Sequence, residues 1–104
     1  MISNQVTITP IAAGTGDTQG VAATANMRLL GFVVRESAGT PAVATLNVCH
    51  GTANTDPVLA PISLIASDTK VAWFGPQGIP CASGLFVDRV AGNSTITFYT
   101  HVVD

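Results

Sequence analysis

MRLLGFVVRE, at Met27–Glu36, is the longest segment of this chain with the pattern of a β-strand. Successive side chains of a strand point to opposite faces of the sheet, so alternation places Leu30, Phe32 and Val34 together on one face. Apolar side chains at every second position are typical of a strand whose one face is buried. We therefore predict a half-buried strand here and look for its partners in the rest of the chain.

The same alternation recurs in six further segments between this strand and the end of the chain. They are residues 42–50, 58–65, 69–74, a short segment at 79–81, 85–90 and 95–102. Thr, Val and Ile, which favour strands, make up 32 of the 104 residues. Glycine and proline separate the segments at short intervals, a spacing typical of sandwiches and barrels. The sequence predicts an all-β fold: an antiparallel β-sandwich of seven or eight short strands, jelly-roll-like.

Residues 1–26 have a different composition, rich in Thr, Ala, Gly and Gln and poor in large apolar side chains. Within them only Gln5–Ile11 has strand character, and residues 21–30 are expected to be extended rather than helical. We predict an extended N-terminal arm over 1–26 and a sandwich domain over 27–104. The arm would pair with a neighbouring molecule through Val6, Ile8 and Ile11, and the alternative is a first strand in the chain's own sheet.

Charge is sparse. Ten residues are charged, the formal net charge is −2 and only four residues are Lys or Arg. This excludes the basic surface that nucleic acids or anionic lipids require. No apolar run approaches the about 18 residues that cross a membrane, and the N-terminus has no secretory signal pattern. So little charge protects a monomer poorly from association, which predicts a homo-oligomer, with a trimer favoured. The alternative is a monomer kept in solution by its hydroxyl groups.

Residues that could carry chemistry are few and badly placed for it. Cys49 and His50 are neighbours on a predicted strand, so their side chains point to opposite faces and form no catalytic pair. His101 is expected to be exposed. The spacing of Cys and His matches no metal site, and no glycine-rich phosphate loop precedes a helix. We predict no catalytic residue, no metal, no cofactor and no enzymatic activity.

The carboxylates and thiols have simpler explanations. Asp56 and Asp68 lie in predicted turns, where aspartate accepts hydrogen bonds from the backbone. Asp88 is expected to pair with an arginine across the sheet. Cys49 and Cys81 are expected to be free, buried thiols, because two cysteines are too few for a disulfide framework.

One string of residues combines bulky aromatics with a turn: Trp73-Phe74-Gly75-Pro76-Gln77-Gly78-Ile79. Proline and glycine stand at positions that suit a type I turn. Trp73 and Phe74 point to opposite faces, so one fills the core while the other either closes the end of the sandwich or contacts a neighbouring molecule. Trp73, Phe74, Gln77 and Tyr99 are the candidate interface residues outside the arm. If the chain binds carbohydrate, the candidates are Tyr99 and the pair Trp73 and Gln77.

Three strings together resemble a family: Arg28–Glu36, Trp73–Ile79 and Gly84–Asp88. Residues 27–104 are similar to small virion structural proteins of tailed bacteriophages. The resemblance implies a capsid decoration (cement) protein on the outer capsid surface, present in the host cytoplasm during assembly. Its partner would be the major capsid protein of a phage shell, with neighbouring capsomers bridged. The alternative is a tail or tail-fibre binding module that recognises carbohydrate.

Overall fold

The computed structural model describes residues 5–103, and these residues form strands, turns and connecting segments without a helix. The strands are β1 (Thr7–Gly14), β2 (Thr18–Val21), β3 (Met27–Glu36), β4 (Ala44–His50), β5 (Val58–Leu64), β6 (Thr69–Trp73), β7 (Ile79–Pro80), β8 (Leu85–Ala91) and β9 (Ser94–Val102). The strands predicted from residue 27 onward all form, and their bounds shift by at most two residues. The all-β prediction is confirmed.

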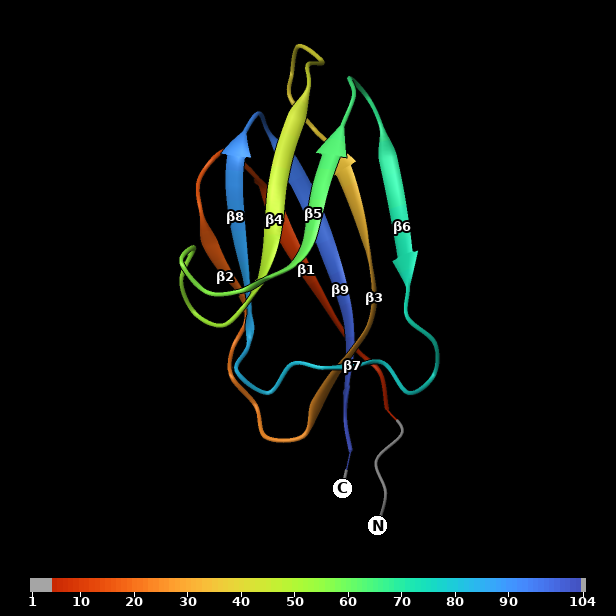
Figure 1. Ribbon diagram of the computed structural model, residues 1–104. Helices are drawn as coiled ribbons and strands as arrows, with labels where there is room; N and C mark the ends of the chain where they lie inside the picture. Colours follow the sequence, from red (N-terminus) through yellow and green to blue (C-terminus); the bar gives the residue numbers. More distant parts are fainter. Residues whose placement is uncertain (1–4, 104) are drawn as a thin grey trace.

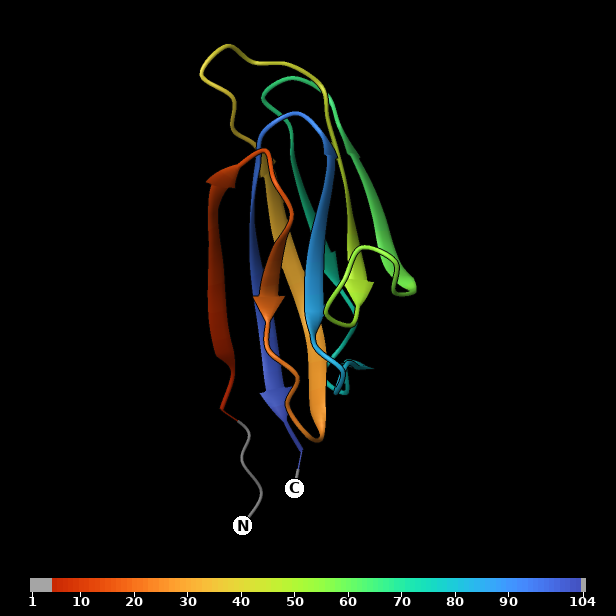
Figure 2. The ribbon, with the colours of Figure 1, turned by 90° about the vertical axis from the view of Figure 1, so that its left-hand side faces the viewer.

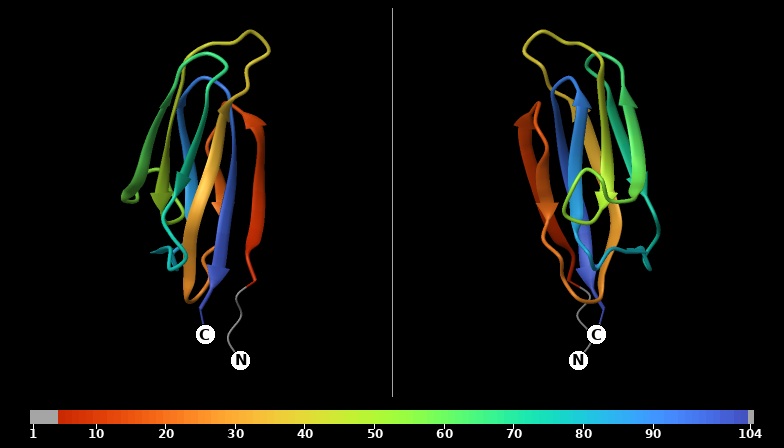
Figure 3. Two further views of the ribbon diagram at one scale, coloured as in Figure 1. Left: turned by 90° about the vertical axis from the view of Figure 1, so that its right-hand side faces the viewer. Right: turned by 60° about the vertical axis from the view of Figure 1, so that its left-hand side comes forward.

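The strands form two antiparallel sheets that pack face to face (Figures 1 and 2). The five-stranded sheet has the order β1-β9-β3-β6, with β7 continuing the β6 side of β3. The four-stranded sheet has the order β2-β8-β4-β5. Figure 3 shows the two layers from both sides. The predicted antiparallel β-sandwich is confirmed, with nine strands in place of seven or eight.

With two-residue β7 set aside, the strands pair in a nested order. β1 pairs with β9, β2 with β8, β3 with β6 and β4 with β5. The first half of the chain therefore runs beside the second half in the reverse direction. This nesting brings the first and last strands into one sheet and places β1 at its edge.

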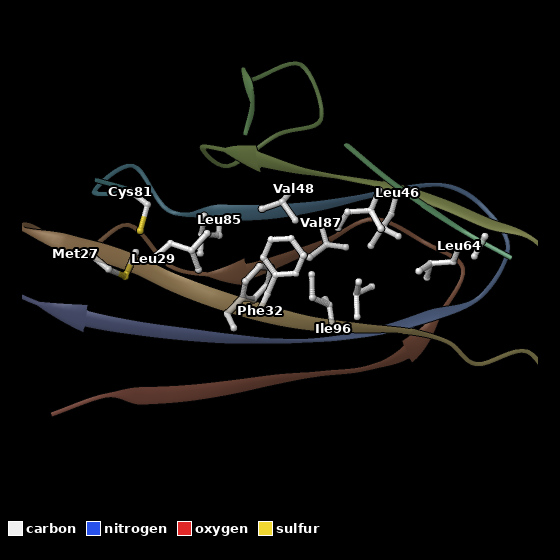
Figure 4. Close-up of a cluster of buried hydrophobic side chains, with 14 residues drawn as sticks. Met27, Leu29, Phe32, Leu46, Val48, Leu64, Cys81, Leu85, Val87 and Ile96 are labelled. Atoms are coloured by element: carbon white, nitrogen blue, oxygen red, sulfur yellow. The ribbon is translucent and has the colours of Figure 1, made fainter. Parts of the chain in front are cut away.

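The core lies between the sheets and is built by the predicted alternation (Figure 4). Leu46 and Val48 on β4 face Ile96 and Phe98 of the other sheet, and all four are almost completely buried. Phe32 packs edge-on against Phe98, with ring centroids 6.4 Å apart. Burial of these side chains stabilises the fold by roughly 1.5–3 kcal/mol each.

One register prediction on β3 is wrong. Leu29, not Leu30, joins Phe32 and Val34 in the core cluster. The pairing with β9 shifts between Leu29 and Gly31, so β3 carries one extra residue there. Such a bulge reverses the alternation on one side of it. Leu30 is buried, but outside the main core.

The predicted arm is also corrected. Of residues 1–26, residues 1–4 lie outside the part of the chain that the structure describes. Residues 7–14 form β1, which pairs with β9 from Thr7 opposite Thr100 to Gly14 opposite Ser94. Residues 18–21 form β2, which pairs with β8. The alternative of a first strand in the chain's own sheet is therefore right, and residues 21–30 are extended as expected. The edge of β9 supplies the hydrogen bonds that this polar segment lacks by itself.

Arg89 fixes the connection between β1 and β2. Its guanidinium donates to the carbonyl oxygens of Ala12 at 2.8 Å, Gly16 at 3.0 Å and Ser94 at 2.9 Å. Its backbone N–H donates to the Asp17 carboxylate at 2.9 Å. Arg89 is itself buried on the inner side of β8, so residues 12–17 are tied to the interior of the sandwich.

Candidate interaction surface

The outer face of the five-stranded sheet carries a row of large side chains from strands far apart in the sequence. Tyr99 on β9 lies opposite Ile8 on β1 and opposite Gly31 on β3, and Gly31 lies opposite Trp73 on β6. Residues paired in this way project on the same side of a sheet. The neighbouring Phe98 projects into the core, so this row projects outward. We call Ile8, Tyr99 and Trp73 the outer row.

The outer row is open to solvent. Trp73 is 63% exposed and Ile8 is 61% exposed, while Tyr99 is half-buried. Because Gly31 has no side chain, the indole ring of Trp73 can lie close to the backbone of β3. A Cβ atom at Gly31 would collide with the carbonyl oxygen of Ala72 and would lie 3.1 Å from Cε3 of Trp73. The ring therefore covers the backbone of β3 at Gly31, as aromatic side chains do beside glycines in sheets.

A second row runs beside the first. Val33 on β3 lies opposite Thr97 on β9 and Val71 on β6, and Thr97 lies opposite Pro10 on β1. Val71 is 71% exposed. The two rows are largely apolar, and Thr97 is their one threonine. We call the outward side of β1, β9, β3 and β6, with these two rows at its centre, the outer face of the five-stranded sheet.

The charges of this outer face are all positive. Arg28 and Arg35 on β3 alternate with core residues and therefore project outward. No outward position of β1, β9, β3 or β6 within residues 5–103 is an Asp or Glu. Glu36, the nearest carboxylate along β3, is buried and lies opposite the buried Ser94.

The opposite side of the molecule carries carboxylates. Cys49 on β4 is buried outside the main core, and its pKa is raised by burial and, to a smaller degree, by Asp88, Asp56 and Asp17. Asp88 projects outward from β8 opposite Asn47, Asp56 lies between β4 and β5, and Asp17 accepts from the backbone N–H of Arg89 on β8. The two outer faces differ in the sign of their charge.

The structure brings together three of the seven predicted interface residues. Ile8, Tyr99 and Trp73 form the outer row, and Val6 is exposed just before β1. Ile11 and Phe74 instead pack against the core. Phe74 lies 6.1 Å from Phe32 between ring centroids. Of the two adjacent aromatics, Phe74 therefore packs against the core and Trp73 points outward.

The remaining interface candidate, Gln77, is exposed in the turn after β6. Gly78 N–H donates to the Gly75 carbonyl at 3.2 Å, which closes the predicted four-residue turn. Gly78 has a positive φ of 68°, a conformation that a side chain would strain. Gln77 lies between Pro76 and Gly78 at the third position of this turn.

Three of the free sheet edges carry residues that oppose strand addition. Pro10 lies within β1 and Pro61 within β5, and proline lacks the N–H that a further strand would need. Lys70 on β6 lies opposite the core residue Val34, so its side chain points toward the space between the sheets. An inward-pointing lysine at an edge discourages pairing, because a new strand would bury its charge.

Two predictions about polar side chains need correction. His101 is half-buried rather than exposed, and its Nε2 is buried without a hydrogen-bond partner. Asp88 lies opposite Asn47, whose amide Nδ2 donates to it at 3.4 Å, rather than opposite an arginine. In both cases the surroundings of the side chain depend on which residue of the adjacent strand lies opposite. The order of the strands decides this, and the pattern within one strand does not contain it.

Cys49 and His50 lie on opposite faces of β4, as predicted. Cys49 is fully buried, whereas His50 is half-buried and accepts a hydrogen bond from the Ser83 N–H at 3.4 Å. Cys49 and Cys81 are both free and buried, which confirms the prediction for the thiols. Burial raises the pKa of Cys81 to about 11.

The carboxylates in turns serve the backbone, as predicted. Asp56 accepts from the N–H groups of Thr52 at 2.8 Å and Ala53 at 3.0 Å. Glu36, which the sequence pattern did not single out, also accepts hydrogen bonds from backbone N–H groups, and these lie in two different loops. Its carboxylate accepts from the N–H of Ser67 at 2.8 Å and of Ala38 at 2.7 Å, and these bonds lower the pKa of Glu36.

Three surface hollows of about 190, 290 and 430 Å³ occur among the described residues, and none of these is lined by His or Cys. Within residues 5–103 no three His, Cys, Asp or Glu side chains gather as a metal site would require. The same residues include no helix long and apolar enough to span a membrane.

Comparisons of the chain with protein-family models, with curated proteins and with solved structures found no match.

Proposed function

We propose that this chain is a virion structural protein of a tailed bacteriophage, of the capsid decoration (cement) type, which binds the outer surface of a shell and bridges neighbouring capsomers. The observation that carries the proposal is the outer row, in which Ile8, Tyr99 and Trp73 are held in solvent on a rigid sheet. Exposed aromatic anchors of this kind are enriched at protein–protein interfaces. The proposed partner is the major capsid protein.

The charge density of the surface supports a protein that is partly covered in use. The chain exposes 5483 Å² and has ten charged residues, about one per 550 Å². An ordinary domain of this size carries about one per 210 Å². A surface with so little charge resists association weakly, which fits a protein whose working state is an assembly. A homo-oligomer, with a trimer expected, belongs to this proposal.

The nested pairing of the strands gives further support. A jelly roll pairs its first strand with its last, its second strand with its second-last, and so on inward. We propose that this sandwich is a jelly roll. Jelly rolls occur in viral capsid domains and in lectins. Fold similarity of this kind raises the expectation of a virion role, while the site itself has to carry the function.

Binding would be driven by burial of apolar area on the outer face. Trp73 alone, which is 63% exposed, presents roughly 100–160 Å², which is worth about 2.5–4 kcal/mol at about 25 cal/mol per Å². Association costs reduce this gain, so a single contact is weak. Repetition over a lattice compensates, because a molecule bound to two capsomers dissociates from both only rarely.

The proposal is tested by co-expressing the chain with the major capsid protein encoded in the same genome. We expect the chain to sediment with assembled shells and to add density on their outer surface in electron micrographs. Shells that form without the chain, and that do not bind it when it is added later, would overturn the proposal.

A second candidate is a tail or tail-fibre module that binds carbohydrate. Trp73 favours it, because a flat exposed tryptophan on a sheet is a stacking surface for a sugar ring. A glycan array with the intact protein separates the candidates: specific signals that vanish in Trp73→Ala favour the carbohydrate module, and an array without signals favours the decoration protein.

A further inference from the structure

We infer that the outer face of the five-stranded sheet, and not a free sheet edge, is the surface that binds the shell, and that the shell offers it an acidic, partly apolar patch. This inference rests on the proposed function and specifies the surface and the chemistry of the partner. It replaces strand addition by the N-terminal segment, which is engaged in the chain's own sheet.

The sheet edges argue against strand addition. Pro10 interrupts the free edge of β1, and Pro61 interrupts that of β5. Lys70 projects inward from β6, the edge beside Trp73. Natural sheets use such residues to keep their edges from pairing with other chains. On the outer face the exposed large hydrophobic side chains are Ile8, Trp73 and Val71, which can be buried against a partner without a strand being added.

Charge selects the partner. The outer face presents Arg28 and Arg35 and no carboxylate, whereas Asp17, Asp56 and Asp88 lie on the other side of the molecule. Complementary potentials orient two surfaces and exclude partners of like charge. An acidic patch on the shell is therefore attracted to this face and repelled by the opposite one, which fixes the side on which the molecule binds.

Charge also argues against a second copy of this chain as the partner. Two outer faces brought together would place arginines opposite arginines, and like charges exclude such a pair. An acidic patch on a shell meets no such repulsion.

A matched pair of substitutions tests which face binds. Val71→Ser removes an exposed apolar side chain from the outer face, and Val90→Ser removes one from β8 of the other sheet, where Val90 is 63% exposed. With shells assembled from the major capsid protein as the probe, Val71→Ser should weaken binding several-fold and Trp73→Ala about 10-fold or more. Val90→Ser should bind as the wild type does. Circular dichroism establishes that all three variants are folded.

A second pair tests the charge. Arg35→Glu should weaken binding about 10-fold. Wild-type binding should fall between about 0.05 M and about 0.5 M salt because salt screens the attraction, and this fall should be smaller in Arg35→Glu, in which only Arg28 still attracts the patch. Lys70→Glu makes the same change on an exposed side chain that does not project from the outer face, and it should leave binding unchanged.

The outcomes separate this inference from the proposed function. If the wild type binds shells and Val90→Ser or Lys70→Glu is the damaging variant, the proposed function stands and the inference is wrong. If wild-type binding is insensitive to salt, an acidic patch is excluded. If the wild type binds no shell but binds a glycan through Trp73, both the proposed function and the inference fall.

Discussion

The guanidinium of Arg89 attaches residues 12–17 to the sandwich through the carbonyl oxygens of Ala12 and Gly16. A charged side chain in this position is costly to bury, and burial lowers the pKa of Arg89. The cost is offset by hydrogen bonds to three carbonyl oxygens and by the nearby charge of Asp17. One arginine therefore converts a segment with the composition of a flexible arm into part of the fold.

Arg89→Met should therefore destabilise the protein by about 2–3 kcal/mol, because the buried carbonyl oxygen of Ser94 and the part-buried ones of Ala12 and Gly16 lose their donor. Urea unfolding followed by circular dichroism measures the loss, since the single tryptophan, Trp73, is already exposed in the folded protein. Arg35→Met is the control, since Arg35 is exposed and its replacement should change stability by less than about 0.5 kcal/mol. Equal losses in the two variants would show that the contacts of Arg89 do not hold the fold.

Glu36 makes the stability of the fold depend on pH. Its pKa is lowered in the folded protein, chiefly by the hydrogen bond from the Ser67 N–H and then by that from Ala38. A carboxylate whose pKa is lower folded than unfolded stabilises the fold above its unfolded pKa, and this contribution disappears as the pH falls through the folded pKa. Acid should therefore loosen the two loops that Glu36 joins.

Glu36→Gln should flatten the fall in thermal stability between about pH 7 and about pH 3, because the amide does not titrate. Melting temperatures over this range provide the measurement. Asp88→Asn is the matched control: the single contact found for Asp88, to Asn47, is 3.4 Å long, so the control should keep the wild-type dependence. Parallel curves for the wild type and Glu36→Gln would contradict the role given to Glu36.

The thiols of Cys49 and Cys81 should be unreactive in the folded protein. Both are buried, and burial is the main cause that raises the pKa of each thiol. Because the thiolate is the reactive form, a thiol reagent at about pH 8 should modify neither residue until urea unfolds the chain. Rapid labelling of the folded protein, or a gain of two hydrogens on reduction, would contradict this.

Among the strands, β6 depends most on a single residue to remain an edge. Lys70 projects from it toward the open side of the sandwich, beside Pro61 and Ile62 of β5. Strand addition at β6 would bury this charge, so Lys70→Val should remove the obstacle and allow edge-to-edge association. Sedimentation velocity should show concentration-dependent oligomers in Lys70→Val. Lys70→Arg, which keeps the charge, should sediment as the wild type does.

Strands with strict alternation could be predicted because alternation is local. Leu46 and Val48 on β4 lie in the core as expected, and so do Leu85 and Val87 on β8. The bulge at Leu30 was missed, since only the pairing with β9 reveals the extra residue. The N-terminal strand was misjudged because its stability comes from β9 and Arg89, which are distant in the sequence.

The candidate surface was predicted in part for the same reason. Trp73, Tyr99 and Ile8 were recognisable as large side chains without a certain place in the core. Their gathering in one row depends on the order β1-β9-β3-β6, which no local pattern contains. Gly31 and Lys70 were missed, because a glycine beneath a tryptophan and a lysine facing inward acquire their meaning only from the neighbouring strand.

The whole molecule combines protected edges, a positive outer face and few charges. The edges and the outer face each limit a different kind of association, while the few charges leave the surface open to partners. Pro10, Pro61 and Lys70 oppose indefinite sheet growth. The outer face carries arginines without carboxylates, so it repels a second copy of itself. A molecule with these properties is suited to binding where many weak contacts occur together.

Binding to assembled shells should therefore be much tighter than binding to the unassembled major capsid protein. A molecule that bridges two capsomers gains a second contact at high effective concentration, and such linkage raises affinity by about 10²–10⁴-fold without new contacts. We expect a difference of at least about 100-fold, measured by sedimentation with shells and by calorimetry with the free subunit. A shell variant that forms single capsomers but no lattice is the control, and it should bind like the free subunit. Equal affinity for shell and subunit would mean that one contact supplies all of the binding, and bridging of capsomers would then be wrong.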